Sequence, residues 1–154
     1  MPKYARCRYL AGHGVASGKT PDPRFPLGTL QMQAPFFLKG GLDLSLYHSG
    51  TLNLSLLCAS IKFLKPDFFF SQVKWSEDLP AENFSFYPCA LRKNNSSCWV
   101  NGFIYWPHPS TKPEFHHPPK TYEILAPTMP DLQLGELMDL RPSGQSFEIA
   151  FLES

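Results

Sequence analysis

Apolar and polar residues alternate over many short segments of this chain, and such alternation is typical of β-strands that bury one face. The clearest case is GTLNLSL, residues 50–56, in which three leucines occupy every second position. We expect Leu52, Leu54 and Leu56 to face the core and the polar residues between them to lie on the other face. The same pattern predicts strands at 3–12, 28–33, 50–56, 61–67, 83–91, 98–106, 121–127 and 146–151.

Two further segments predict short helices between the strands. PFFLKGG, residues 35–41, predicts a helical turn that stops at Gly40 or Gly41 in the left-handed conformation. PDLQLGELMDL, residues 130–140, predicts a second helix with its apolar residues loosely on one side. About six to eight strands with one or two short helices predict an all-β protein, and a closed barrel would remove exposed strand edges. The chain length predicts a single domain over residues 1–154.

Proline is unusually common, with 16 prolines in 154 residues, about twice the average share. Because proline fixes φ and lacks a backbone donor, its clusters predict long ordered loops between strands. One of these loops carries His108, His116 and His117. These imidazoles either bind zinc or pack within the loop, and packing is favoured because adjacent histidines on an extended chain point in opposite directions. The clusters lie at 20–26, 106–120 and 126–131.

The charges are nearly balanced, with 14 Lys and Arg against 13 Asp and Glu. No strong field therefore recruits nucleic acid or an anionic membrane, so we expect neither as a partner. No run approaches the roughly 18 apolar residues that a membrane helix needs. Lys3, Arg6 and Arg8 interrupt the apolar residues at the N-terminus, which argues against a signal peptide and predicts a cytoplasmic protein.

The four cysteines stand at positions 7, 58, 89 and 98, without the C-x-x-C spacing of a zinc or redox pair. Cys89 and Cys98 flank a turn-like segment and could face each other as a disulfide across a hairpin of 83–91 and 98–106. Because nothing else indicates an oxidising compartment, we expect buried free thiols instead.

The alternating pattern places Thr51 and Asn53 on the polar face of the strand at 50–56, where they form a candidate site. Side chains at positions i and i+2 of a strand lie on one face, about 6.6 Å apart at a rise of about 3.3 Å per residue. A threonine hydroxyl and an asparagine carbonyl at that separation can converge on Mg²⁺, which prefers oxygen ligands. The alternative is an ordinary solvated strand face. GTLQMQ, residues 28–33, repeats the Gly-Thr-Leu start, which indicates either an internal duplication or chance.

The order of motifs resembles the archaeal CTP-dependent riboflavin kinase family. The motifs are SGTLNLSL at 49–56, VNGFIYWP at 100–107, HHP at 116–118 and EILAP at 123–127. The resemblance covers roughly residues 41–56 and 86–152, with a weaker match at 14–18. It implies a cradle-loop, RIFT-like β-barrel that binds Mg²⁺ and a nucleotide, CTP or ATP. It also implies transfer of a phosphoryl group to a hydroxyl of a small acceptor, which in that family is riboflavin.

The resemblance also assigns roles to individual residues. Thr51 and Asn53 match the family's Mg²⁺ ligands, and Glu123 matches the acidic residue that contacts the acceptor. The nucleotide-phosphate loop of the family falls, in part, on Gly14, Ser17 and Gly18. Such an enzyme acts by positioning its substrates and neutralising phosphate charge.

Two regions depart from the pattern of that family. Residues 19–27 form a proline-rich insertion where the family has a Gly-Glu-Gly loop, so a nucleotide would have to be held differently. Phe115 replaces the threonine that contacts the flavin; a phenyl ring cannot donate that hydrogen bond, but it can stack on an aromatic acceptor. The sequence thus leaves two functions open, a Mg²⁺-dependent phosphotransferase and a non-catalytic module that binds a small ligand or a protein.

Overall fold

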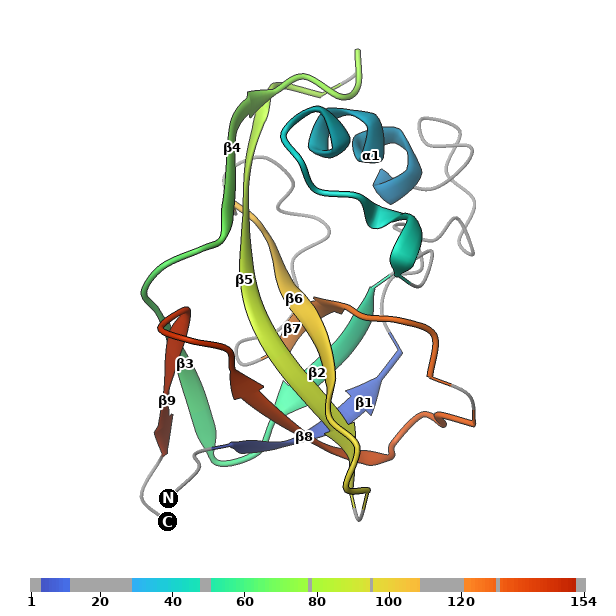
Figure 1. Ribbon diagram of the computed structural model, residues 1–154, viewed down its shortest axis with the longest axis vertical. Helices are drawn as coiled ribbons and strands as arrows, with labels where there is room; N and C mark the ends of the chain where they lie inside the picture. Colours follow the sequence, from blue (N-terminus) through green and yellow to red (C-terminus); the bar gives the residue numbers. More distant parts are fainter. Residues whose placement is uncertain are drawn as a thin grey trace.

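Six antiparallel strands close into a β-barrel, which confirms the all-β barrel predicted from the sequence (Figure 1). The computed structural model describes residues 4–11, 29–47, 51–77, 79–94, 96–108, 121–129 and 131–151. The helices of this part are α1 (Thr29–Lys39) and the 3₁₀ helix η1 (Leu44–Leu46). Its strands are β1 (Ala5–Leu10), β2 (Leu52–Leu56), β3 (Ala59–Phe63), β4 (Phe68–Val73), β5 (Glu82–Lys93), β6 (Val100–Pro107), β7 (Thr121–Leu125), β8 (Leu137–Pro142) and β9 (Phe147–Phe151).

The barrel strands follow the order β5-β6-β7-β2-β1-β8, and the ring closes where β8 pairs with β5. Strand β5 has 12 residues, so its first half pairs with β4 and its second half with β8 along the same edge. Strand β6 runs along the other edge of β5 and forms the predicted hairpin with it. Strand β4 therefore extends the sheet beyond the barrel, and β3 and β9 form a separate two-stranded sheet.

The barrel interior is apolar, as the alternation at 50–56 predicts. Leu52, Leu54 and Leu56 are 6%, 0% and 4% exposed, which confirms their place in the core. The β3–β9 pair packs against this core through Phe63, whose ring stacks on Tyr87 with centroids 4.2 Å apart. Other barrel strands contribute Ala5, Cys7, Leu91, Ile104, Ile124, Met138 and Leu140.

The strand predicted at 28–33 is wrong, because Thr29–Lys39 form helix α1. Leu30, Gln33 and Phe37 are all buried, and their spacing of three and four residues is the period of a helix face. Six residues were too few to separate this period from the two-residue period of a strand. The repeated Gly-Thr-Leu segment is therefore not a structural duplication.

Helix α1 ends at Lys39 and Gly41 follows with φ of +97°, as the predicted left-handed stop requires. The N–H of Leu42 donates to the carbonyl of Phe37, and that of Gly41 to the carbonyl of Leu38, each at 3.0 Å. These two bonds define a Schellman motif, and Leu42 and Phe37 supply its buried apolar pair. The motif directs the chain from α1 into η1.

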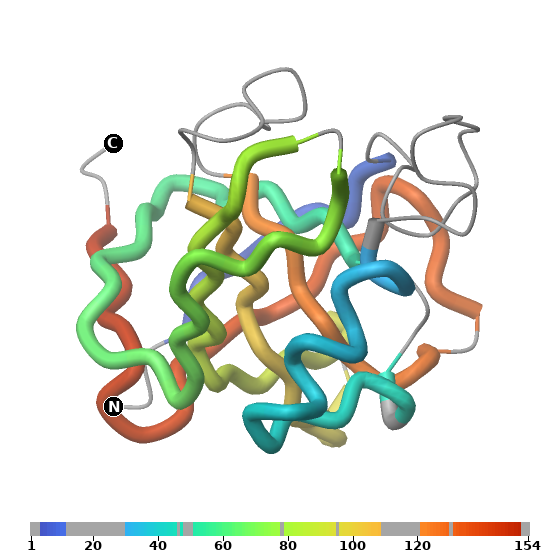
Figure 2. Tube along the Cα trace, turned by 90° about the horizontal axis from the view of Figure 1, so that it is seen from above, coloured from blue at the N-terminus to red at the C-terminus, as the bar shows by residue number. Residues whose placement is uncertain are grey.

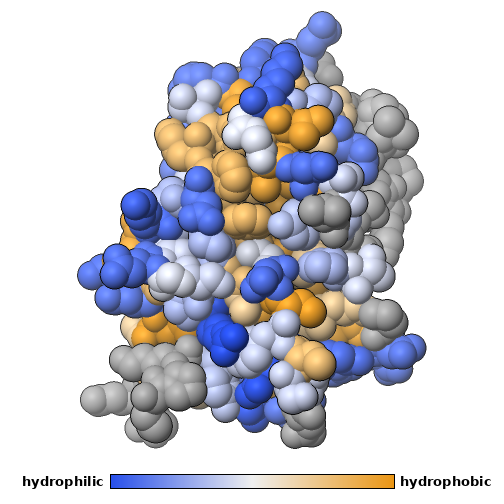
Figure 3. Space-filling model, viewed as in Figure 1, coloured by the Kyte–Doolittle hydropathy of each residue, from blue (hydrophilic) through white to orange (hydrophobic). Residues whose placement is uncertain are grey.

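Helix α1 covers the outer face of the barrel wall and creates a second core there. The ring of Phe37 lies 5.1 Å from Phe70, 5.2 Å from Phe84 and 4.9 Å from Phe86, measured between centroids. Figure 2 shows α1 and η1 side by side on this flank, and apolar side chains gather over α1 and β4 in Figure 3. Within the described ranges, no helix is long and apolar enough to cross a lipid bilayer.

Two other elements differ from the predictions. The helix predicted at 130–140 is wrong, because turns with left-handed residues at Asp131 and Gly135 lead into strand β8. Strand β4 was not predicted, because three consecutive phenylalanines give no alternation. In the sheet, Phe68 and Phe70 pack against the second core while Phe69 is 54% exposed.

All four cysteines are free, which confirms the expectation of free thiols and excludes the Cys89–Cys98 disulfide. Cys7 and Cys89 are buried, whereas Cys58 and Cys98 are exposed, so the expectation of burial is right for two of them only. Cys89 points into the barrel opposite Gly102, and Cys98 precedes the start of β6.

We predict that a thiol reagent such as DTNB separates these cysteines into two classes at pH 8. Cys58 and Cys98 react quickly in the native protein, whereas Cys7 and Cys89 react only after unfolding in guanidinium. Burial, with a smaller contribution from Asp139, raises the pKa of Cys7 to about 12, and burial also raises the pKa of Cys89. A C58S/C98S variant should show no fast phase, and rapid labelling of more than two thiols would contradict the described core.

Candidate functional site

A row of polar side chains crosses three neighbouring strands on the outer face of the barrel, beside the second core. Asn53 on β2 is the direct cross-strand partner of Glu123 on β7, and Glu123 is in turn the partner of Tyr105 on β6. Direct partners of an antiparallel sheet lie on the same face. The leucines of β2 face the interior, so Asn53 and the two residues paired across from it face outward.

Thr51 joins this row immediately before β2. Its Oγ1 donates a hydrogen bond to Oε1 of Glu123 at 3.0 Å. The structure thus brings Thr51, Asn53 and Glu123 together, although the sequence assigned the first two to a cation and the third to an acceptor molecule. The result is one cluster of oxygen atoms: a hydroxyl, an amide carbonyl and a carboxylate.

The amide oxygen of Asn53 is the most informative atom of the cluster. The residue is 7% exposed, and Oδ1 is buried without a hydrogen-bond partner. Leaving a buried acceptor unsatisfied costs about 1–3 kcal/mol, so such an atom calls for an explanation. Hydroxyl, amide carbonyl and carboxylate oxygens are the types of ligand that a hard cation such as Mg²⁺ prefers.

Tyr105 and Gln33 extend the polar row beneath helix α1. The hydroxyl of Tyr105 donates to Oε1 of Gln33 at 2.6 Å, while Nε2 of Gln33 is buried without a partner. Burial, followed by the charges of Glu123 and Glu82, raises the pKa of Tyr105 well above its usual value. Tyr105 is therefore a neutral donor at every physiological pH.

Sequence reasoning missed Gln33 and Tyr105 for different reasons. Gln33 lay in the segment mistaken for a strand, and Tyr105 looked like one more aromatic core residue. The period of three and four residues formed by Leu30, Gln33 and Phe37 was the available signal, since it places a polar residue on the buried face of a helix.

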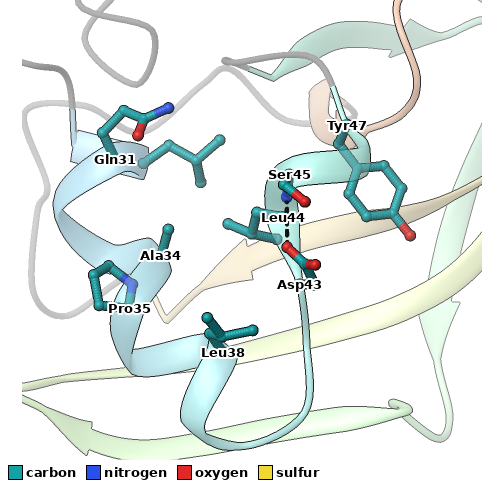
Figure 4. Close-up of a pocket in the computed structure, with 9 residues that line it drawn as sticks. Gln31, Ala34, Pro35, Leu38, Asp43, Leu44, Ser45 and Tyr47 are labelled. Carbon is teal, nitrogen blue, oxygen red and sulfur yellow. Dashed lines mark hydrogen bonds between the residues drawn. The ribbon is translucent and has the colours of Figure 1, made fainter.

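A pocket of about 500 Å³ lies between α1 and η1 (Figure 4). Tyr47, at one side of it, contacts the ring of Phe103 with centroids 6.1 Å apart. Phe103 pairs with Leu125, two residues from Glu123 on the same face of β7, so the pocket and the polar row share one flank of the barrel. The pocket is lined by Leu30, Gln31, Ala34, Pro35, Leu38, Asp43, Leu44, Ser45 and Tyr47.

Several predicted site residues lie outside the described residues. They include the candidate acceptor contact Phe115, the insertion 19–27, and His116 and His117. Of the three histidines only His108 is described, and its Nε2 lies 3.1 Å from Oγ of Ser85. Among the described residues, no group of three or more His, Cys, Asp or Glu side chains could hold a metal ion. The predicted nucleotide loop also lies outside, with Gly14, Ser17 and Gly18.

We predict that Asn53→Leu raises the free energy of unfolding of the metal-free protein by about 1 kcal/mol, because it removes a buried acceptor that has no partner. Urea unfolding followed by circular dichroism measures the change. Ser55→Ala on the same strand face is the matched control, and its effect should stay within about 0.5 kcal/mol. A loss of stability in the leucine variant would contradict this prediction.

Neither a family model nor a curated protein matches this chain. Its function is therefore inferred from the geometry of the polar row and the pocket beside it.

Proposed function

We propose that this chain is a Mg²⁺-dependent phosphotransferase that uses CTP or ATP to phosphorylate a hydroxyl group of a small molecule. The observation that carries the proposal is the buried, unpartnered Oδ1 of Asn53 in one cluster with Thr51 and Glu123. This oxygen set suits a hard divalent cation. The motif order that resembles archaeal riboflavin kinases supports the nucleotide and the class of acceptor.

Asn53 and Thr51 would hold the cation through Oδ1 and Oγ1, and the closed barrel keeps Asn53 in place. When bound, Mg²⁺ neutralises charge on the transferring phosphate. The carboxylate of Glu123 accepts a hydrogen bond from the acceptor hydroxyl. In the transfer, that hydroxyl oxygen bonds to the γ-phosphorus while the bond to the bridging oxygen breaks. The nucleoside diphosphate then leaves, and the proton passes through Glu123 to solvent.

The acceptor binds in the pocket between α1 and η1. Its volume of about 500 Å³ lies in the range of about 300–1,000 Å³ that is usual for small-molecule sites. Apolar contacts to a planar molecule come from Leu30, Leu44 and the ring of Tyr47. Tyr47 also contacts Phe103 of β6, and β6 pairs with β7, the strand that carries Glu123.

A non-catalytic binding module is the second candidate, and the pocket itself favours it. Most of the lining residues are apolar and belong to α1 and η1, so a ligand can bind there without any cation. In that case the polar row helps to shape the pocket but transfers no phosphoryl group.

We predict that Mg²⁺ together with CTP or ATP raises the melting temperature of the protein by roughly 5–10 °C when the nucleotide concentration is about one hundred times its Kd. The shift disappears in Asn53→Ala, because a cation ligand is lost, and persists in the matched control Ser55→Ala. Differential scanning fluorimetry measures the shift, and mass spectrometry then detects phosphorylated riboflavin or another hydroxylated acceptor.

The absence of a Mg²⁺-dependent shift with both nucleotides would overturn the phosphotransferase proposal. A shift with riboflavin alone that is independent of Mg²⁺ and unchanged in Asn53→Ala would favour the binding module instead.

A further inference from the structure

The arginines of the described residues gather on one part of the barrel wall. Arg6 and Arg8 lie on β1, Arg92 on β5 and Arg141 on β8, three strands that are neighbours in the sheet. Their neighbours in sequence fill the interior, so the arginine side chains face outward. The whole chain has a formal net charge of only +1, so these arginines are not part of a generally basic chain.

One carboxylate pairs with two of these arginines. Asp139 of β8 is 1% exposed and accepts from Nε of Arg6 at 3.3 Å and from Nε of Arg92 at 2.9 Å. One negative charge is thus shared between two guanidinium groups. With Arg141 included, the cluster of three arginines and Asp139 carries a net charge of about +2, because arginine stays protonated in proteins.

Two of the guanidinium groups contact the ring of Trp99. The Cζ atom of Arg92 lies 4.4 Å from the centre of the Trp99 ring, and that of Arg141 lies 4.0 Å from it. The edge of Tyr4 contacts the same indole with centroids 6.1 Å apart. Cation–π contacts restrain long side chains, so Trp99 restrains both arginines before any ligand arrives.

The guanidinium of Arg141 differs from the other two. Among the described residues, Arg6 and Arg92 pair with Asp139, but no carboxylate or carbonyl oxygen accepts a hydrogen bond from Arg141. Its N–H donors are therefore available while its plane is fixed against Trp99. A guanidinium with open donors in a fixed position suits bidentate binding of an oxyanion.

We propose that Arg92, Trp99 and Arg141 form a binding site for the phosphate group of a phosphate monoester. The charge decides the class of ligand, because a monoester carries about −1.5 to −2 at neutral pH and balances the net charge of the cluster. A phosphodiester or a carboxylate carries a single negative charge, so about one positive charge of the cluster would stay unbalanced. The arginines of this site lie on β5 and β8, whereas the polar row lies on β2, β7 and β6. The site does not depend on the proposed function.

The test is isothermal titration calorimetry with inorganic phosphate at pH 7.5 and low ionic strength, with dimethyl phosphate as the singly charged comparison. We expect saturable binding of inorganic phosphate and binding of dimethyl phosphate that is at least about tenfold weaker. Arg141→Gln should weaken phosphate binding about tenfold or more, because a charge-assisted pair is lost.

Arg8→Gln is the matched control, since it removes the same charge from the same wall. Arg8 donates to the carbonyl of Gly135 at 2.7 Å and takes no part in the contacts of Trp99. Its variant should bind phosphate within about twofold of the unmodified chain. If Arg141→Gln fails to fold, Arg141→Lys replaces it, because it keeps the charge but loses the bidentate fork, and it should still weaken binding several-fold.

The absence of saturable phosphate binding by the unmodified chain would overturn the proposal. Equal losses in the Arg8 and Arg141 variants would overturn it too, because they would show that phosphate responds only to the overall charge of the wall.

Discussion

The pairing of β5 with β8 is the contact on which the rest of the structure depends, because it converts an open sheet into a closed barrel. Closure gives each barrel strand one face toward the interior and one face outward, and it links the stagger of all the strands. The registers of β2 on β7 and of β7 on β6 are therefore constrained together. Those registers place Glu123 between Asn53 and Tyr105 on the outer face.

Helix α1 turns part of that outer face into an interior. Phe37 packs among Phe70 of β4 and Phe84 and Phe86 of β5. Gln33, four residues earlier, reaches the polar row. Water is displaced from this region, so hydrogen bonds there are strengthened and unpaired polar atoms are costly. The described part of the chain nevertheless keeps two such atoms, Oδ1 of Asn53 and Nε2 of Gln33. Their retention is understandable if the site is built to receive a ligand rather than to maximise stability.

The sequence predicted an element correctly where its pattern fits only a strand or only a helix, and it failed where a short segment fits both. The leucines of β2 could be placed in the core because their two-residue period extends over a whole strand. Leu30 and Met32 showed the same period within six residues, yet they belong to a helix whose buried face is set by packing on the barrel. Thr51 and Asn53 could be grouped from strand geometry alone. Their contact with Glu123, about 70 residues away, depends on a register that no local pattern encodes.

The long strand β5, which closes the barrel by pairing with β8, also pairs with β4 and leaves β4 as an edge strand of the sheet. Within the described part of the chain, β4 pairs only with β5, so its other edge presents unpaired backbone groups beside the exposed ring of Phe69. Such an edge is a template for pairing with a second molecule. Between Phe70 and Val73 the register slips by one residue, and Gln72 adopts a left-handed conformation with φ of +54°. This bulge bends the strand and shortens its straight edge, and a shorter, twisted edge is a poorer template for edge-to-edge pairing.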